Sequence, residues 1–274
     1  MTCCPVLVVL LAVLLPAAAG AQTAPPADQS DPDARVDALQ PDFTLAALPT
    51  TLRMPVRKWA FRTTHRFNRP LGQGDFGDLA SDLFGFDSGA RIGLELRYGL
   101  ARGTQVGVHR TSDRTIQLFG QHNFLMERNG TPLGLDAIAT LEGGNNLRER
   151  RKSALGAVAS RSIGRLAALY AEPLVVFNSS SGFGQGADHT VMLGLGGRLR
   201  IRPSTYLVGE ITPRLGGFKP GASQASFGLE GRAGGHLFQL NFSNGFGTTL
   251  GQIAEGAFNS DDWYIGFNIV RKFF

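Results

Sequence analysis

The feature that most constrains this chain is a period-two alternation of apolar and polar side chains from residue 53 onward. In the clearest run, RIGLELRYGL, Ile92 and Leu94 share one parity while Glu95 and Arg97 share the other. Successive side chains of a β-strand point to opposite faces, so the pattern predicts strands with one apolar and one polar face. The expected strands cover about 57–67, 91–100, 104–112, 114–126, 132–142, 152–163, 166–178, 189–201, 205–215, 223–233, 236–243 and 262–274. We therefore expect an all-β fold with about twelve strands.

The lengths of these runs and of their connections indicate a membrane protein. Most runs have the length that a tilted strand needs to cross a bilayer. Short and long connections alternate along the chain, apart from one tight turn at 112–114. Transmembrane barrels combine short periplasmic turns with longer external loops, and they must close because hydrocarbon cannot satisfy an open sheet edge. A soluble β-sandwich also alternates, but the connections favour a closed antiparallel transmembrane β-barrel in the bacterial outer membrane.

The start of the sequence is typical of a secreted protein. The uncharged stretch PVLVVLLAVLLPAAAGA is too short to span a bilayer as a helix, and it ends in small residues just before Gln22. We expect residues 1–21 to be a signal peptide. Both cysteines, Cys3 and Cys4, lie within it, so the mature chain is expected to have neither disulfides nor cysteine-bound metals.

The next segment, 22–52, begins AQTAPPADQSDPDAR and is rich in Pro, Asp, Ala and Gln. Such a composition has little to bury, so it predicts an exposed periplasmic linker holding at most one short helix. The barrel domain is then expected to occupy residues 53–274. An even number of strands places both ends of the barrel on the periplasmic side, next to the linker.

The C-terminus carries two aromatic residues, Phe273 and Phe274. The machinery that assembles outer-membrane barrels reads a terminal aromatic residue, so we expect these two to form the assembly signal. The expected partners are that machinery and the outer-membrane lipids. Phe274 is one residue out of phase with the apolar parity of Ile265 and Phe267, so either a bulge restores its phase or Phe273 faces the lipid.

The polar parity of the strands predicts which charged side chains face the lumen. It includes eight basic and five acidic residues: Lys58, Arg62, Arg66, Arg91, Glu95, Arg97, Asp136, Glu172, Arg198, Arg200, Glu210, Glu230 and Arg232. Charged side chains in a narrow water-filled pore select ions by sign, so one hypothesis is a passive channel or facilitator for small solutes with a mild preference for anions.

A second hypothesis gives the same charges a structural role. Twelve strands lie between the filled eight-stranded barrels and the open porins, so the side chains can also pair with one another across a filled lumen. The protein would then be a non-conducting barrel that acts as a structural or interaction module. Glu172-Pro173 and Glu210 near Pro213 predict bulges or breaks in two strands, since proline cannot donate to the ladder. These breaks either bend the wall or bring the glutamates to the lumen arginines.

Other motifs in the sequence do not indicate catalysis or metal binding. The five histidines form no metal-binding pair, and the sequence shows no nucleophile and base that belong together, so we expect no metal, no cofactor and no enzymatic activity. The net charge of +5 comes from scattered arginines, which excludes a nucleic-acid footprint. The long connection after the first strand predicts a short helix capped by Asp75, with Phe76 and Leu79 on one face. The sequence names neither a solute nor a periplasmic partner.

Four stretches resemble an uncharacterised family of bacterial outer-membrane β-barrels that is defined as a domain of unknown function. They are LPTTLRMPVRKWAFRTTHRF, DLFGFDSGARIGLELRYGL, VGEITPR and YIGFNIVRKFF. The resemblance covers residues 53–274. It implies the barrel fold and the outer-membrane location, and it implies no activity.

Overall fold

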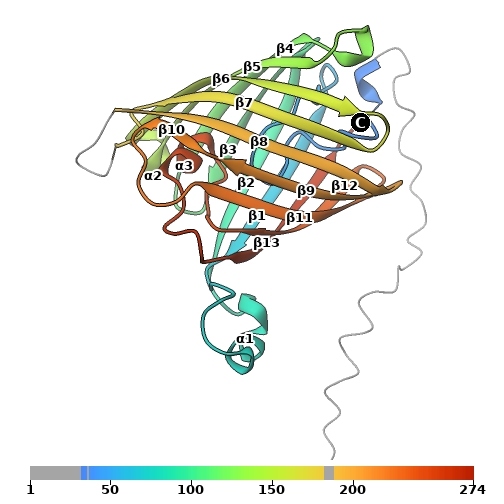
Figure 1. Ribbon diagram of the computed structural model, residues 1–274. Coiled ribbons are helices and arrows are strands. Elements are labelled where there is room, and N and C mark those ends of the chain that lie inside the picture. The colour runs from blue at the N-terminus through green and yellow to red at the C-terminus, as the bar shows by residue number, and fades with distance from the viewer. Residues whose placement is uncertain (1–31, 36, 182–187) are drawn as a thin grey trace, which may run out of the picture.

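The computed structural model forms one closed antiparallel sheet and describes residues 32–35, 37–181 and 188–274 (Figure 1). The sheet closes because β1 pairs with both β2 and β13, and β9 pairs with both β8 and β11. The strands are β1 Trp59–Phe67, β2 Ala90–Ala101, β3 Thr104–Thr111, β4 Ile116–Leu125, β5 Gly134–Gly143, β6 Glu149–Ile163, β7 Ala167–Phe177, β8 His189–Arg202, β9 Thr205–Thr212, β10 Arg214–Gly217, β11 Gln224–Ala233, β12 His236–Ser243 and β13 Tyr264–Lys272. β9 and β10 are two parts of one strand, so the twelve expected strands are confirmed.

The side chains alternate between the outer face and the lumen, as the sequence predicts. On β2, Leu94 and Leu96 are exposed on the outside, whereas Glu95 and Arg97 are buried. The outer face carries most of the large exposed apolar side chains, which suits a wall in contact with lipid acyl chains. No helix in the described part of the chain is long and apolar enough to cross a membrane.

Pro173 and Pro213 have different effects on the strand pairing of the barrel wall. β9 ends at Thr212, directly before Pro213, and the pairing of β10 with β8 shifts register between Arg214 and Gly216. The predicted break is confirmed there. β7 instead runs through Pro173 without a register shift, and only its pairing with β6 lapses beside Glu172 and Pro173.

Short helices lie in the connections and near the start of the described chain. Their bounds are η3 Pro32–Ala34, α1 Phe76–Ser81, η4 Leu83–Gly85, η5 Glu127–Asn129, α2 Gly144–Leu147 and α3 Leu250–Glu255. α1 projects away from the barrel, and the side chain of Asp75 caps it as predicted (Figure 1). α3 instead folds inward, and its Leu250, Ile253 and Ala254 are buried.

Residues 39–52, which we call the plug, occupy the lumen, and all fourteen are buried. The plug is a hairpin in which Thr44 bridges Pro49 and the N–H of Leu45 donates to the carbonyl of Leu48 at 2.7 Å. The prediction of an exposed linker is therefore wrong for this part. The apolar letters FTLAAL within it have side chains to bury, unlike the proline- and aspartate-rich letters before them. The expected signal peptide lies outside the described residues.

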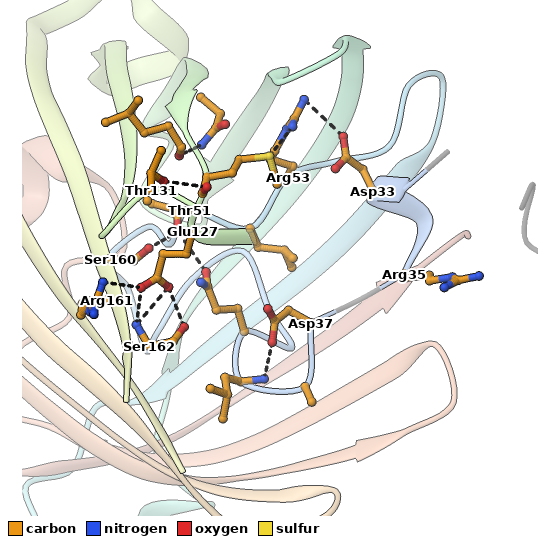
Figure 2. Close-up of a pocket in the computed structure, with 18 of the residues that line it drawn as sticks. Asp33, Arg35, Asp37, Thr51, Arg53, Glu127, Thr131, Ser160, Arg161 and Ser162 are labelled. Carbon is orange, nitrogen blue, oxygen red and sulfur yellow. Dashed lines mark hydrogen bonds and ion pairs between the residues drawn. The ribbon is translucent and has the colours of Figure 1, made fainter. Parts of the chain in front are cut away.

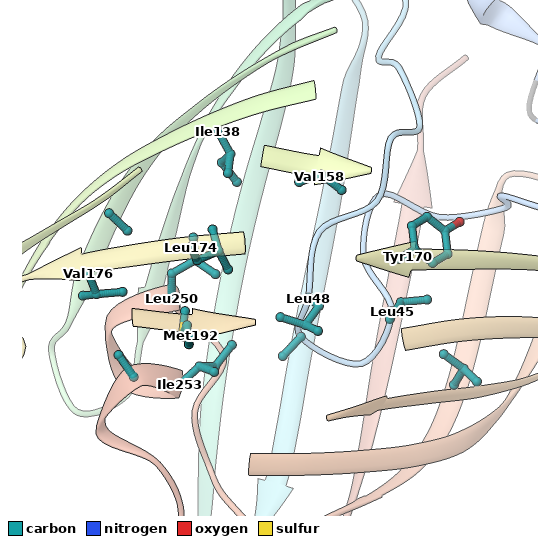
Figure 3. Packing of buried hydrophobic residues seen from close by; sticks show 14 of the residues in the cluster. Leu45, Leu48, Ile138, Val158, Tyr170, Leu174, Val176, Met192, Leu250 and Ile253 are labelled. Carbon is teal, nitrogen blue, oxygen red and sulfur yellow. The ribbon is translucent and has the colours of Figure 1, made fainter. Parts of the chain in front are cut away.

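The apolar core sits inside the barrel, around the tip of the plug (Figure 3). Leu45 and Leu48 belong to one buried cluster with side chains from the barrel wall and from α3. The wall contributes Ile138, Val158, Tyr170, Leu174, Val176 and Met192, and α3 contributes Leu250 and Ile253. Burying the two leucines contributes about 2 kcal/mol each to holding the tip in place.

The two terminal aromatic residues point in opposite directions. Phe273 is 55% exposed on the outer face, where Arg271 lies over its ring. Phe274 turns inward and packs edge-on against Phe43 of the plug, with ring centroids 6.5 Å apart. Of the two arrangements expected from the sequence, the structure has the one in which Phe273 lies on the outer face.

This division predicts different phenotypes for the two aromatic residues. Phe273→Ala should lower the amount of assembled barrel, because it removes the aromatic side chain that faces lipid at the strand end. Phe274→Ala should assemble nearly as well as the parent but hold the plug less tightly. Heat-modifiable gel mobility of outer-membrane fractions measures the assembled amount. If Phe274→Ala alone prevents assembly, this assignment of the signal is wrong.

Candidate functional site

The lumen has one polar and one largely apolar wall, and the plug fits between them. Inward side chains of β6, β7 and β8, such as Val158, Leu174 and Met192, form most of the apolar wall. Those of the strands from β11 through β13 and β1 to β4 are mainly polar, as in Gln121 and Asn241. A segment placed here must therefore offer apolar side chains to one wall and hydrogen-bonding groups to the other.

Glu210 on β9 binds the tip of the plug from one side. Its carboxylate accepts the backbone N–H groups of Ala46, Ala47 and Leu48, each at 3.0 Å. Buried backbone donors need partners, and hydrogen bonds to a charged acceptor are stronger than neutral ones. One carboxylate thus accepts three successive backbone N–H donors of the turn.

The carbonyl of Ala46 is bound by a different part of the wall, β1 and β13. It accepts from Arg62 and Arg66 on β1, the latter at 3.4 Å, and from the amide of Asn268 on β13 at 3.0 Å. We call Glu210, Arg62, Arg66 and Asn268 the tip clasp. The tip clasp binds both the N–H donors and the carbonyl acceptor of one peptide turn.

Further polar side chains bind the remaining carbonyls of the plug. They are Arg198 to Thr44 at 2.9 Å, Gln239 to Leu45 at 3.2 Å, Gln121 to Thr50 at 2.7 Å, Gln105 to Leu52 at 3.1 Å, and Lys272 to Pro41. Glutamine side chains and cations of the polar wall thus take the place of water around a buried backbone. The plug is fixed by a network along its whole length.

Two ion pairs complete the lumen. Arg97 binds Glu95 at 2.9 Å, and its guanidinium lies over Phe43 of the plug and Phe119 of β4. Arg198 binds Glu230 at 2.8 Å, and both side chains are fully buried. Arg97 and Glu95 both belong to β2, whereas Arg198 and Glu230 join β8 to β11 across β9. The two pairs neutralise half of the arginines buried beside the plug.

The structure brings nine of the thirteen predicted lumen residues into the buried interior: Arg62, Arg66, Glu95, Arg97, Asp136, Glu172, Arg198, Glu210 and Glu230. The other four lie apart from them. Arg91 is exposed at the loop end, over the ring of Phe246, and Lys58, Arg200 and Arg232 are half-buried at the end with the short turns.

Sequence reasoning missed the plug and several side chains that bind it. Asn268 and Lys272 share the inward parity of the last strand, so that parity was a usable signal for both. The plug had a weaker signal, the apolar letters FTLAAL within a polar segment. Where these apolar residues are buried depends on the lumen, and its two walls are formed by strands that are far apart in sequence.

α3 closes the loop end of the lumen. Glu142 accepts the N–H of Gly251 at 3.0 Å, Lys152 pairs with Glu255, and the guanidinium of Arg214 binds the carbonyls at the end of the helix. A very small pocket remains beside Asp113. Burial raises the pKa of the Asp113 carboxyl, but hydrogen bonds from Thr111 and Thr115 outweigh it and leave that pKa below its usual value.

A larger cavity of about 690 Å³ opens at the end with the short turns (Figure 2). Residues from both ends of the plug line it, together with the ends of β4, β5 and β6. Arg53 pairs with Asp33 at 3.3 Å, and Thr51 shares a 2.6 Å hydrogen bond with Ser160. Both ends of the plug therefore leave the lumen through the same opening.

The polar groups of the lumen hold a peptide turn. Among the described residues no three His, Cys, Asp or Glu side chains are placed to hold a metal ion. A closed barrel with an apolar outer face and a polar interior defines a β-barrel of the bacterial outer membrane.

The chain belongs to the family described as Membrane bound beta barrel domain (DUF5777), whose model matches residues 42–273. The match begins within the plug, so the plug is part of the family's domain. No curated protein sequence matches the chain.

Solved structures share the fold at low sequence identity. The COG4313 outer membrane channel from Pseudomonas putida F1 is 14% identical, with a TM-score of 0.51 over 87% of this chain and all of that one. The KdgM porin in complex with disordered oligogalacturonate is 8% identical, with a TM-score of 0.48 over 77% of this chain and 98% of that one. The first likeness supports the barrel fold.

The role of Glu210 can be tested with a cysteine reporter. In a chain with Cys3→Ser and Cys4→Ser, the variant Ala47→Cys places one thiol at the buried tip. Adding Glu210→Ala leaves three N–H groups without their acceptor, which costs the plugged state about 3 kcal/mol and should speed maleimide labelling about 100-fold. Glu149→Ala, an exposed glutamate, is the matched control. Equal labelling rates would show that Glu210 does not hold the plug.

The Arg97–Glu95 pair should matter for stability. Arg97→Gln leaves Glu95 without its cation inside the barrel, and breaking such a buried pair costs about 3–5 kcal/mol. The folded band on a heat-modifiable gel should disappear at lower temperature than in the parent. Arg102→Gln, in an exposed turn, should melt like the parent. Unchanged melting of Arg97→Gln would show that the pair contributes nothing to stability.

Proposed function

We propose that this protein is an outer-membrane channel for small solutes and that residues 39–52 are its plug. The observation that carries the proposal is that polar side chains of the lumen bind the backbone of a hairpin that belongs to no strand of the wall. Water or a solute can also form hydrogen bonds with these side chains. The proposal includes no enzymatic step and no cofactor.

The topology supports release of the plug. The plug precedes β1, so its withdrawal separates no pair of strands. Its two ends line one cavity at the end with the short turns, which is periplasmic in outer-membrane barrels. A hairpin with both ends on one side can leave through that side.

The charges around the plug support only a weak preference for anions. Arg97 and Arg198 are paired with Glu95 and Glu230, which neutralises much of the basic excess predicted from sequence. The remaining charges are separated. Arg62 and Arg66 lie on β1, four strands away from Glu210 on β9, so a solute between them experiences a field across the lumen.

Deleting the plug tests the proposal. Replacing residues 40–51 by Gly-Ser-Gly should leave the barrel folded, because the ends of the deletion lie at the same cavity. In planar bilayers the deletion variant should show a large, steady single-channel conductance, whereas the full chain should conduct rarely. The reversal potential in a salt gradient should show a weak anion preference.

A deletion of similar size in the projecting α1 connection, residues 72–87, is the control and should leave conductance unchanged. A plug deletion that folds but does not conduct would contradict the channel proposal. It would favour the second candidate, a non-conducting barrel that serves as a structural or interaction module. The packed lumen and the inward fold of α3 are the observations in favour of that candidate.

A further inference from the structure

The site around the plug tip contains charged side chains that form no ion pair with the tip. Arg62 and Arg66 both reach the Ala46 carbonyl, which is a neutral acceptor. Neither guanidinium forms an ion pair within the described residues. Two arginines around one oxygen have the charge and the donors to bind a carboxylate.

On the opposite side of the site lies a carboxylate that has no hydrogen-bond partner among the described residues. Glu172 on β7 is fully buried, and neither of its carboxylate oxygens has a hydrogen-bond partner in the described part of the chain. A buried carboxylate without donors is costly, so such a group needs an explanation. Glu210, within electrostatic reach, is already bound to the N–H groups of the tip.

Two glycines of β8 shape the floor between these glutamates. A Cβ atom at Gly194 would lie 3.0 Å from the Leu48 side chain and 3.1 Å from Cβ of Glu172. A Cβ at Gly196 would lie 2.3 Å from the Leu45 side chain. The floor thus has room for branched apolar side chains directly beside the acidic groups.

We infer that this site binds short apolar peptides with free ends, in place of the plug tip. The inference deepens the proposed function by naming a class of solute, and it requires that the plug can be displaced. The peptide would run across the lumen rather than fold back as the tip does. Its apolar side chains would lie on the floor at Gly194 and Gly196, and its backbone N–H groups would donate to Glu210. Its terminal ammonium would bind Glu172 on β7, and its terminal carboxylate would bind Arg62 and Arg66 on β1.

Other small solutes fit the site less well. An inorganic anion would gain the arginines but face Glu172 and Glu210 as well. A sugar has hydroxyl groups for the polar wall but nothing apolar for the floor at Gly194 and Gly196. A peptide combines donors, acceptors and apolar side chains, and the present occupant, itself a peptide turn, uses all three.

The full chain carrying the Ala47→Cys reporter described above tests the inference. The probe is the tetrapeptide Leu-Ala-Ala-Leu, which has the sequence of the tip. Binding should displace the plug and speed maleimide labelling at least tenfold. N-acetylation or C-terminal amidation of the peptide should each raise the half-maximal concentration about tenfold, and Gly-Ser-Gly-Ser should have no effect.

Glu172→Gln should abolish the difference between the free and the N-acetylated peptide while keeping the effect of amidation. Glu149→Gln should change neither, and the heat-modifiable band shows that both variants fold. If the tetrapeptide fails to speed labelling although Glu210→Ala does, or if Gly-Ser-Gly-Ser works equally well, the inference is wrong. The channel proposal is judged separately, by the conductance of the plug deletion.

Discussion

The structure depends on one constraint, that a peptide turn buried inside a membrane barrel must have partners for its N–H and C=O groups. Glu210 satisfies three donors of the turn, and Arg62, Arg66 and Asn268 surround the carbonyl of Ala46. These groups come from β9, β1 and β13, so the turn connects parts of the wall that are not neighbours. Without the plug, the same charges would need water or a solute.

The apolar half of the lumen makes this arrangement specific. Leu45 and Leu48 pack against the wall of β6 to β8 and against α3. Their burial fixes the depth of the hairpin, and the polar contacts fix its orientation. A lumen with two unlike walls therefore accepts a segment of matching polarity, which is the physical basis for both the plug and the proposed peptide site.

Glu172 differs from the other acidic side chains of the lumen. Glu95 and Glu230 each have an arginine, and Glu210 has the plug. Glu172 has no hydrogen-bond partner among the described residues, although it lies beside the site where the tip is held. It lies next to Pro173, where the pairing of β7 with β6 lapses.

The sequence by itself determined the twelve strands, their inward and outward faces and the capped helix at Asp75, because these follow from local periodicity and composition. Tertiary structure alone decided what fills the lumen. Glu210 and Ala47 are 163 residues apart, and no local pattern links a carboxylate on one strand to a turn before the first. The sequence did not reveal the inward turn of α3 or the packing of Phe274 on Phe43 for the same reason, since each depends on the closed barrel.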